Sequence, residues 1–155
     1  MTRTRPAPSP APAPAAVPSP PPPGRRAGHA LGALVDAVLL VAIHAWPGWD
    51  VVPLLTGETP RVLGVVTAAL VAGLVVHLVQ VLRTPAWVAP AGLVVTSALG
   101  AVATAAVYRV FPFDVTGGWE VVFRVVLVVG VVGSCIGVVA ALASLLRMYA
   151  AGSSR

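Results

Sequence analysis

The chain has 155 residues, of which 57% are hydrophobic and 10% charged, and its formal net charge is +5. A soluble domain carries about 25% charged residues, so this composition excludes an ordinary water-soluble fold. The single cysteine, Cys135, excludes an internal disulfide framework and a multi-cysteine metal site.

The N-terminal segment is dominated by proline, because residues 1–28 hold 10 of the 16 prolines in the chain. Proline has no backbone N–H, so this segment cannot form a regular helix or sheet. Its prolines also interrupt any apolar run, which excludes a secretory signal peptide. We therefore expect a disordered cytoplasmic tail over residues 1–28, and a passive spacer is favoured over a ligand for a groove-type domain.

Four apolar runs follow, each of 17 residues or more. About 20 helical residues are needed to cross a hydrocarbon layer of ~30 Å. The fold class predicted is all-α: a four-helix transmembrane bundle in residues 29–149, followed by a short cytoplasmic tail at 150–155. The four helices are expected at about 30–46, 61–83, 87–109 and 120–147.

The abundance of valine in these runs would favour strands in water. In lipid an open strand would leave its backbone donors and acceptors unpaired, at a cost of several kcal/mol each. The thirteen Val, Ile and Leu residues between Val125 and Leu146 contribute roughly −4 to −8 kcal/mol to insertion as a helix. Helices are therefore predicted in all four runs.

The arginines, which are the only basic residues besides histidine, indicate the orientation. Seven lie on the side of the termini and of the second loop, and three lie at the first and third loops. The seven are Arg3, Arg5, Arg25, Arg26, Arg83, Arg147 and Arg155. Positive residues stay inside, so both termini are expected in the cytoplasm and the protein in the cell (inner) membrane. Contact with anionic lipid accounts for the basic charge, and no nucleic-acid partner is predicted.

Asp36 is the first candidate for a functional residue, because it lies about two turns into the first predicted helix. A carboxylate at mid-membrane costs up to ~2.5–3.5 kcal/mol if charged, so a partner is expected. His77 lies at the same predicted depth, about 10 Å from the cytoplasmic surface, on the second helix. Gln80 lies one turn nearer that surface. Such a group can hold or pass a proton, and a structural interhelical hydrogen bond is the alternative.

The other histidines predict no cofactor. His44 is placed near the outer surface, and His29 is placed at the inner rim, a full turn or more from His77. A bis-histidine haem needs two histidines at similar depth on different helices, so haem is rejected. No metal site, cofactor or catalytic residue is predicted, because the chain has no phosphate loop, Ser-His-Asp arrangement, HExxH or CxxC.

A second polar group is expected at the outer side, near the third loop. It consists of Arg109, Asp114, Glu120 and Arg124, which balance in charge. Glu120 and Arg124 have the favourable i, i+4 order on a helix. A structural clasp on the loop is preferred to a site for a small ligand.

Small residues recur every fourth position on the predicted helices. The clearest cases are Ala69–Gly73 on the second helix and Gly133–Gly137–Ala141 on the fourth. Close backbone approach at such positions favours helix packing in lipid. We expect these residues to mark contacts within the bundle.

Two segments resemble a group of small four-span membrane proteins from actinobacteria. They are HAWPGWDVVPLLT at residues 44–56, followed by TPRVL, and YRVFPFD at 108–114, with the later RVVLVVG. The resemblance covers about residues 30–148. It implies the same membrane fold and setting, nominates the third loop as a functional surface, and implies no particular activity.

The function predicted is that of a non-enzymatic accessory or interaction component of the cell envelope. Its predicted partners are the lipid bilayer and either another membrane protein or a second copy. The alternative is a small proton-coupled transporter that uses Asp36. Four short helices with an acidic residue in the first resemble the small multidrug resistance family, although here the residue is Asp rather than Glu and the arginine bias is strong.

Overall fold

The computed structural model describes residues 23–82 and 87–153. Its elements are α1 (Pro23–His44), the single-turn 3-10 helix η1 (Trp49–Val51), α2 (Pro60–Leu82), α3 (Val88–Val110) and α4 (Gly118–Ser153). The described residues contain no strand beyond one isolated β-bridge. The all-α class with four helices is confirmed, and each of the four is long and apolar enough to cross a membrane.

Two helix ends lie beyond the predicted spans. The first helix starts at Pro23, where a proline is tolerated because the N–H of a first helical residue has no partner within the helix. Residues 23–28, predicted as part of the tail, are therefore helical, and the rest of that tail lies outside the described residues. The fourth helix continues to Ser153, so its 36 residues extend about 54 Å, well beyond a hydrocarbon layer of ~30 Å.

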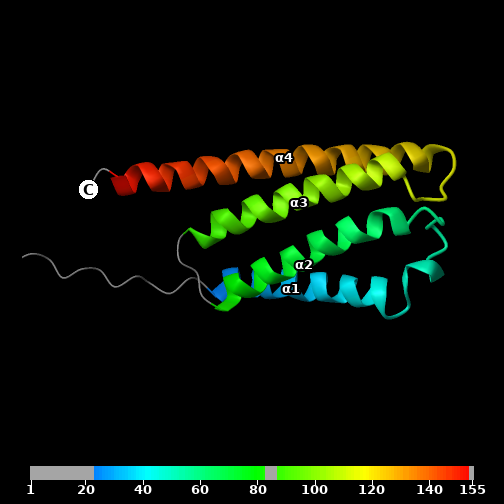
Figure 1. Cartoon of the computed structure of the whole chain (residues 1–155), viewed down its shortest axis with the longest axis horizontal. Coiled ribbons are helices and arrows are strands. Elements are labelled where there is room, and N and C mark those ends of the chain that lie inside the picture. Colours follow the sequence, from blue (N-terminus) through cyan, green and yellow to red (C-terminus); the bar gives the residue numbers. More distant parts are fainter. Residues whose placement is uncertain (1–22, 83–86, 154–155) are drawn as a thin grey trace, which may run out of the picture.

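The four helices lie in an open row rather than a closed bundle (Figure 1). Among the described residues, α1 packs on α2, α2 on α3 and α3 on α4, whereas no Cα atoms of non-neighbouring helices come within 8 Å of each other. Short antiparallel connections make sequence neighbours into spatial neighbours. Closure would also need matching faces on α1 and α4, and these two helices do not meet.

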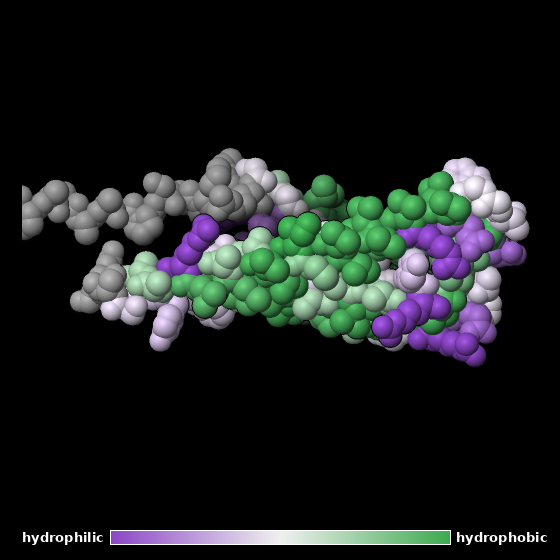
Figure 2. All heavy atoms as spheres, turned by 90° about the horizontal axis from the view of Figure 1, so that it is seen from above, coloured by the Kyte–Doolittle hydropathy of each residue, from purple (hydrophilic) through white to green (hydrophobic). Residues whose placement is uncertain are grey.

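A hydrophobic belt covers the middle of the molecule, with hydrophilic residues gathered toward both ends (Figure 2). Large apolar side chains are exposed along the edge helices, for example Leu31 on α1 at 62% and Val139 on α4 at 68%. Such exposure would be costly in water, but lipid tails are as apolar as these side chains. The open row is therefore consistent with a lipid environment.

The first and third loops are joined at the end of the molecule opposite the chain termini. Leu55 and Phe113 form the antiparallel bridge. The Thr56 amide donates to the Pro112 carbonyl at 3.0 Å, and the Asp114 amide donates to the Leu54 carbonyl at 2.9 Å. Pro112, whose carbonyl accepts one of these bonds, is fully buried. This loop junction links the α1–α2 hairpin to the α3–α4 hairpin.

Small residues pack between the helices as the four-residue pattern predicts, with one exception. Ala141 is buried, and a Cβ at Gly137 would lie 2.7 Å from the Ser97 hydroxyl of α3. Gly73 packs against α1. Gly133 has no side chain near it, so this member of the pattern does not mark a contact between the described helices.

Candidate functional site

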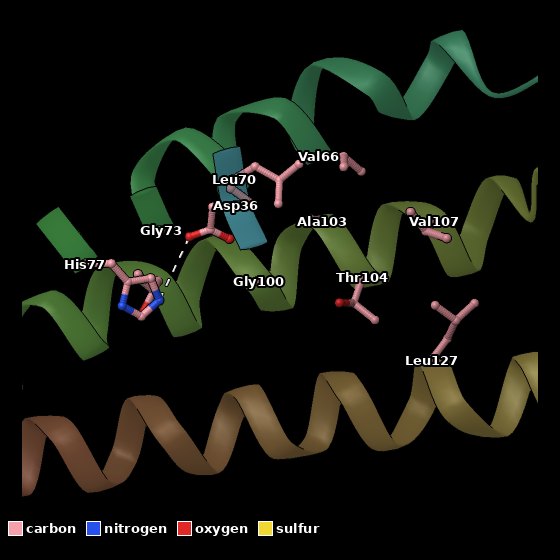
Figure 3. Close-up of a pocket in the computed structure, with 12 residues that line it drawn as sticks. Asp36, Val66, Leu70, Gly73, His77, Gly100, Ala103, Thr104, Val107 and Leu127 are labelled. Atoms are coloured by element: carbon pink, nitrogen blue, oxygen red, sulfur yellow. Dashed lines mark ion pairs between the residues drawn. The ribbon is translucent and has the colours of Figure 1, made fainter. Parts of the chain in front are cut away.

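Each helix of the α1–α2 hairpin places a glycine opposite an ionisable side chain of the other. Figure 3 shows one of the two glycines, Gly73, next to Asp36. A Cβ at Gly73 of α2 would lie 2.7 Å from Asp36 Oδ2 of α1, and a Cβ at Gly32 of α1 would lie 2.7 Å from His77 Nε2 of α2. On each helix the glycine precedes the ionisable residue by four positions. This reciprocal arrangement makes room for both side chains between the helices.

The structure brings Asp36 and His77 together, with His77 Nε2 3.9 Å from Asp36 Oδ2. This distance is too long for a direct hydrogen bond. The two side chains are largely covered, at 17% exposed for Asp36 and 32% for His77. Asp36 Oδ2 and His77 Nδ1 are buried without a hydrogen-bond partner in the described part of the chain. Buried polar atoms of this kind are rarely left unpaired in proteins, which marks the pair as a candidate site.

The sequence predicts that Asp36 and His77 lie at the same depth, but in the structure their depths differ. Asp36 lies against Gly73, whereas His77 lies one helical turn nearer the terminal end, against Gly32. The side chains reach toward each other along the hairpin. The reason is the packing: the glycines fix the register of the two helices, and counting residues from the predicted span ends could not detect that register.

His29, which the sequence places at the inner rim a full turn or more from His77, has its ring beside that of His77 in this site. The centroids of the His29 and His77 rings are 5.8 Å apart. Because α1 starts at Pro23, His29 is a regular helical residue, and its ring faces α2. Gln80 also faces this region, and its amide nitrogen lies 3.1 Å from where a Cβ would be at Gly92 of α3.

Two adjoining clefts surround these residues. The first, of about 400 Å³, is lined by Asp36 and His77, by Thr96 and Thr104 of α3, and by apolar residues that include Val66 and Leu127. The second, of about 450 Å³, lies nearer the terminal end and is lined by His29, His77, Gln80 and Thr96. His77 and Thr96 line both clefts. A mostly apolar cleft with a few convergent polar groups is the usual form of a small-ligand site.

His44 takes part in the same hairpin at its other end. Its Nε2 lies 2.7 Å from the Thr67 hydroxyl of α2, a hydrogen-bond distance. The sequence predicts His44 as a side chain near the outer surface and gives no sign of this partner. Polar contacts between α1 and α2 therefore occur at both ends and in the middle of the hairpin.

Of the four residues predicted to form the outer clasp, the structure pairs two. Arg124 Nε donates to Glu120 Oε1 at 2.9 Å. The guanidinium carbon of Arg124 also lies 4.3 Å from the Phe111 ring centroid, within cation–π range. Asp114 contributes its backbone amide to the loop junction, and Arg109 is exposed and joins neither group in the described structure. Backbone pairing and ring contacts, rather than a four-residue charge network, hold this end together.

The aromatic side chains at the loop junction were not predicted to act together. The Phe113 ring lies 4.9 Å from that of Phe123 and 5.5 Å from that of Phe111, measured between centroids. The motif FPF was visible in the sequence, but its contact with the first loop depends on the bridge to Leu55. This cluster packs at the loop end of the molecule.

Within the described ranges, no three His, Cys, Asp or Glu residues are grouped so that they could hold a metal ion. Comparison of the chain with protein-family models, with curated proteins and with solved structures found no match.

Proposed function

We propose that this chain is a multi-pass protein of the cell membrane, with both termini in the cytoplasm, and that it works as a non-enzymatic interaction component of the envelope. The observation that carries the proposal is the open row of helices. Among the described α-helices, α1 contacts only α2 and α4 contacts only α3. Each therefore keeps a long apolar side available to another membrane protein or a second copy.

The orientation follows from the charges. The arginines are concentrated on the side of the termini, seven against three, and cytoplasmic loops of membrane proteins carry the excess of positive residues. The acidic residues other than Asp36 lie at the opposite end, among them Asp50, Glu58 and Asp114. This asymmetry supports a cytoplasmic location for both termini.

Photo-crosslinking tests the interaction proposal. A crosslinking residue at Leu31 or Val139, on the two edge helices, is expected to give one adduct of defined mass in cells. The same residue at Val71 of α2, which is exposed on an inner helix of the row, serves as the control and should give much less. Lipid adducts alone from both edge positions, with the protein monomeric, would contradict the proposal.

A second candidate, proton-coupled transport, is favoured by one observation: the Asp36–His77 pair lies in a cleft of about 400 Å³ between apolar helices, with polar atoms unpaired. Imidazole and carboxylate groups are the usual proton carriers within membrane spans. If this candidate is correct, efflux of a dye from proteoliposomes under a pH gradient should be lost in Asp36→Asn and retained in Asp114→Asn. Equal efflux in both variants would reduce the pair to a packing role.

A further inference from the structure

The polar groups around the Asp36–His77 pair are distributed unequally along the molecule. Toward the terminal end lie His29, Gln80 and Thr96, all lining the second cleft. Toward the loop end, Thr104 is the last polar residue that lines the first cleft. Beyond it the lining consists of the apolar residues Val66, Val107 and Leu127. The pair therefore has polar neighbours on one side and an apolar wall on the other.

The two ends of this path are formed by different residues. At the loop end, the ring of Phe113 lies against those of Phe111 and Phe123, and Pro112 is buried. Backbone bonds between the two loops hold this cluster in place. At the terminal end, the second cleft lies among His29 near the start of α1, Gln80 near the end of α2 and Ala89 at the start of α3.

We infer that the Asp36–His77 pair is a hydrated proton-binding site and that water reaches it only from the terminal end of the molecule. The route is the second cleft, in which His29 is the first ionisable residue that water meets. The inference deepens the transport candidate and rests on it for its biological use. Asp36 and His77 both line the first cleft, which has room for water, and the 3.9 Å between Asp36 Oδ2 and His77 Nε2 is too long for a direct hydrogen bond. A water held by the polar groups of this cleft can link the two side chains. The apolar wall at Val66, Val107 and Leu127 offers water no comparable partners.

The titratable groups that face this water are few. Helix α1 contributes His29 and Asp36, and helix α2 contributes His77. Helix α3 contributes only the hydroxyls of Thr96 and Thr104, and α4 contributes Leu127. Protons that arrive from the terminal side would meet His29 first, then His77, then Asp36.

Thiol labelling tests this route without requiring any transport. In a Cys135→Ala background, Thr96→Cys places a thiol at the junction of the two clefts. A membrane-impermeant, charged methanethiosulfonate should modify it from the side on which Ser153→Cys is also modified, and not from the opposite side. Ser97→Cys is the matched control, because Ser97 is the next residue of α3 and faces Gly137 of α4. It should remain unmodified from both sides.

The residue at position 29 provides the second measurement. His29→Trp should slow the modification of Thr96→Cys at least tenfold, and His29→Ala should leave the rate unchanged or raise it. Modification of Thr96→Cys from the loop side, its absence from both sides, or equal rates in the two His29 variants would overturn the inference. If His29→Trp disturbs the fold instead, Ser97→Cys becomes reactive. The modification rate of Thr96→Cys in the His29→Ala variant then decides: a slower rate than in the unchanged protein overturns the route, and an unchanged or faster rate supports it. Loss of dye efflux alone would bear on transport and leave the route standing.

Discussion

Gly73→Ala is expected to destabilise the protein, whereas Gly64→Ala on the same helix is expected to leave its stability unchanged or raise it slightly. A methyl group at Gly73 would lie 2.7 Å from Asp36 Oδ2 and 3.2 Å from its Cγ, so α1 and α2 must move apart or the carboxylate must turn away. Overpacking of this kind costs about 1–3 kcal/mol. No heavy atom of a neighbouring side chain lies within 4 Å of a Cβ at Gly64, and alanine favours a helix over glycine by up to ~1 kcal/mol.

The measurement is the free energy of unfolding of both variants in mixed micelles, followed by circular dichroism during titration with a denaturing detergent. Gly32→Ala should behave as Gly73→Ala does, since its methyl would meet the His77 ring. If the Gly73 and Gly64 variants proved equally stable, the close approach of α1 and α2 at this point would be contradicted.

The paired substitution Asp36→Leu/His77→Leu is expected to be at least as stable as the wild type, although His77→Leu alone is destabilising. The single change removes the imidazole that lies 3.9 Å from the Asp36 carboxylate, within ion-pair distance. Removing one partner of a buried ion pair is destabilising because the remaining charge is uncompensated. Replacing both partners by apolar residues removes that cost, and such double replacements are often neutral or stabilising. A polar pair that the fold does not need for stability is best explained by a function.

The same unfolding titration distinguishes a functional role of the Asp36–His77 pair from a structural one. If the double variant were the least stable of the three proteins, Asp36 and His77 would be a structural interhelical contact. Comparison with Asp114→Leu, which changes a carboxylate outside the hairpin, controls for the general effect of adding an apolar side chain.

The sequence predicted the helices well and their arrangement less well. Composition and run length are enough to locate four apolar helices, because a spanning segment must satisfy its own backbone hydrogen bonds. They do not determine where a helix ends beyond the apolar run, as the start at Pro23 and the end at Ser153 show. They also do not say whether the first and last helices meet, since closing the row depends on the shapes of facing side chains.

The candidate site was predicted in part for a similar reason. Asp36 and His77 could be nominated because ionisable residues are costly within a membrane span. Their register, and the position of His29 beside His77, depend on the reciprocal glycines Gly32 and Gly73. Residue spacing on one helix says which residues share a face, but the register between two helices is a property of their packing.

The outer loops show most clearly which contacts a local sequence pattern can predict and which it cannot. The i, i+4 spacing was sufficient to predict the pairing of Glu120 and Arg124. The bridge between Leu55 and Phe113 joins residues far apart in the chain and leaves no local pattern. A clasp of charged residues was therefore predicted where backbone bonds and aromatic rings hold the loops.

The proposed function depends on the membrane topology, which labelling of single cysteines can test. In a Cys135→Ala background, Gly57→Cys lies in the first loop and Ser153→Cys lies at the end of α4, both at exposed positions. An impermeant maleimide should label Gly57→Cys in intact cells and Ser153→Cys only after the membrane is permeabilised. Labelling of both positions in intact cells, or of Ser153→Cys alone, would contradict four spans with both termini in the cytoplasm.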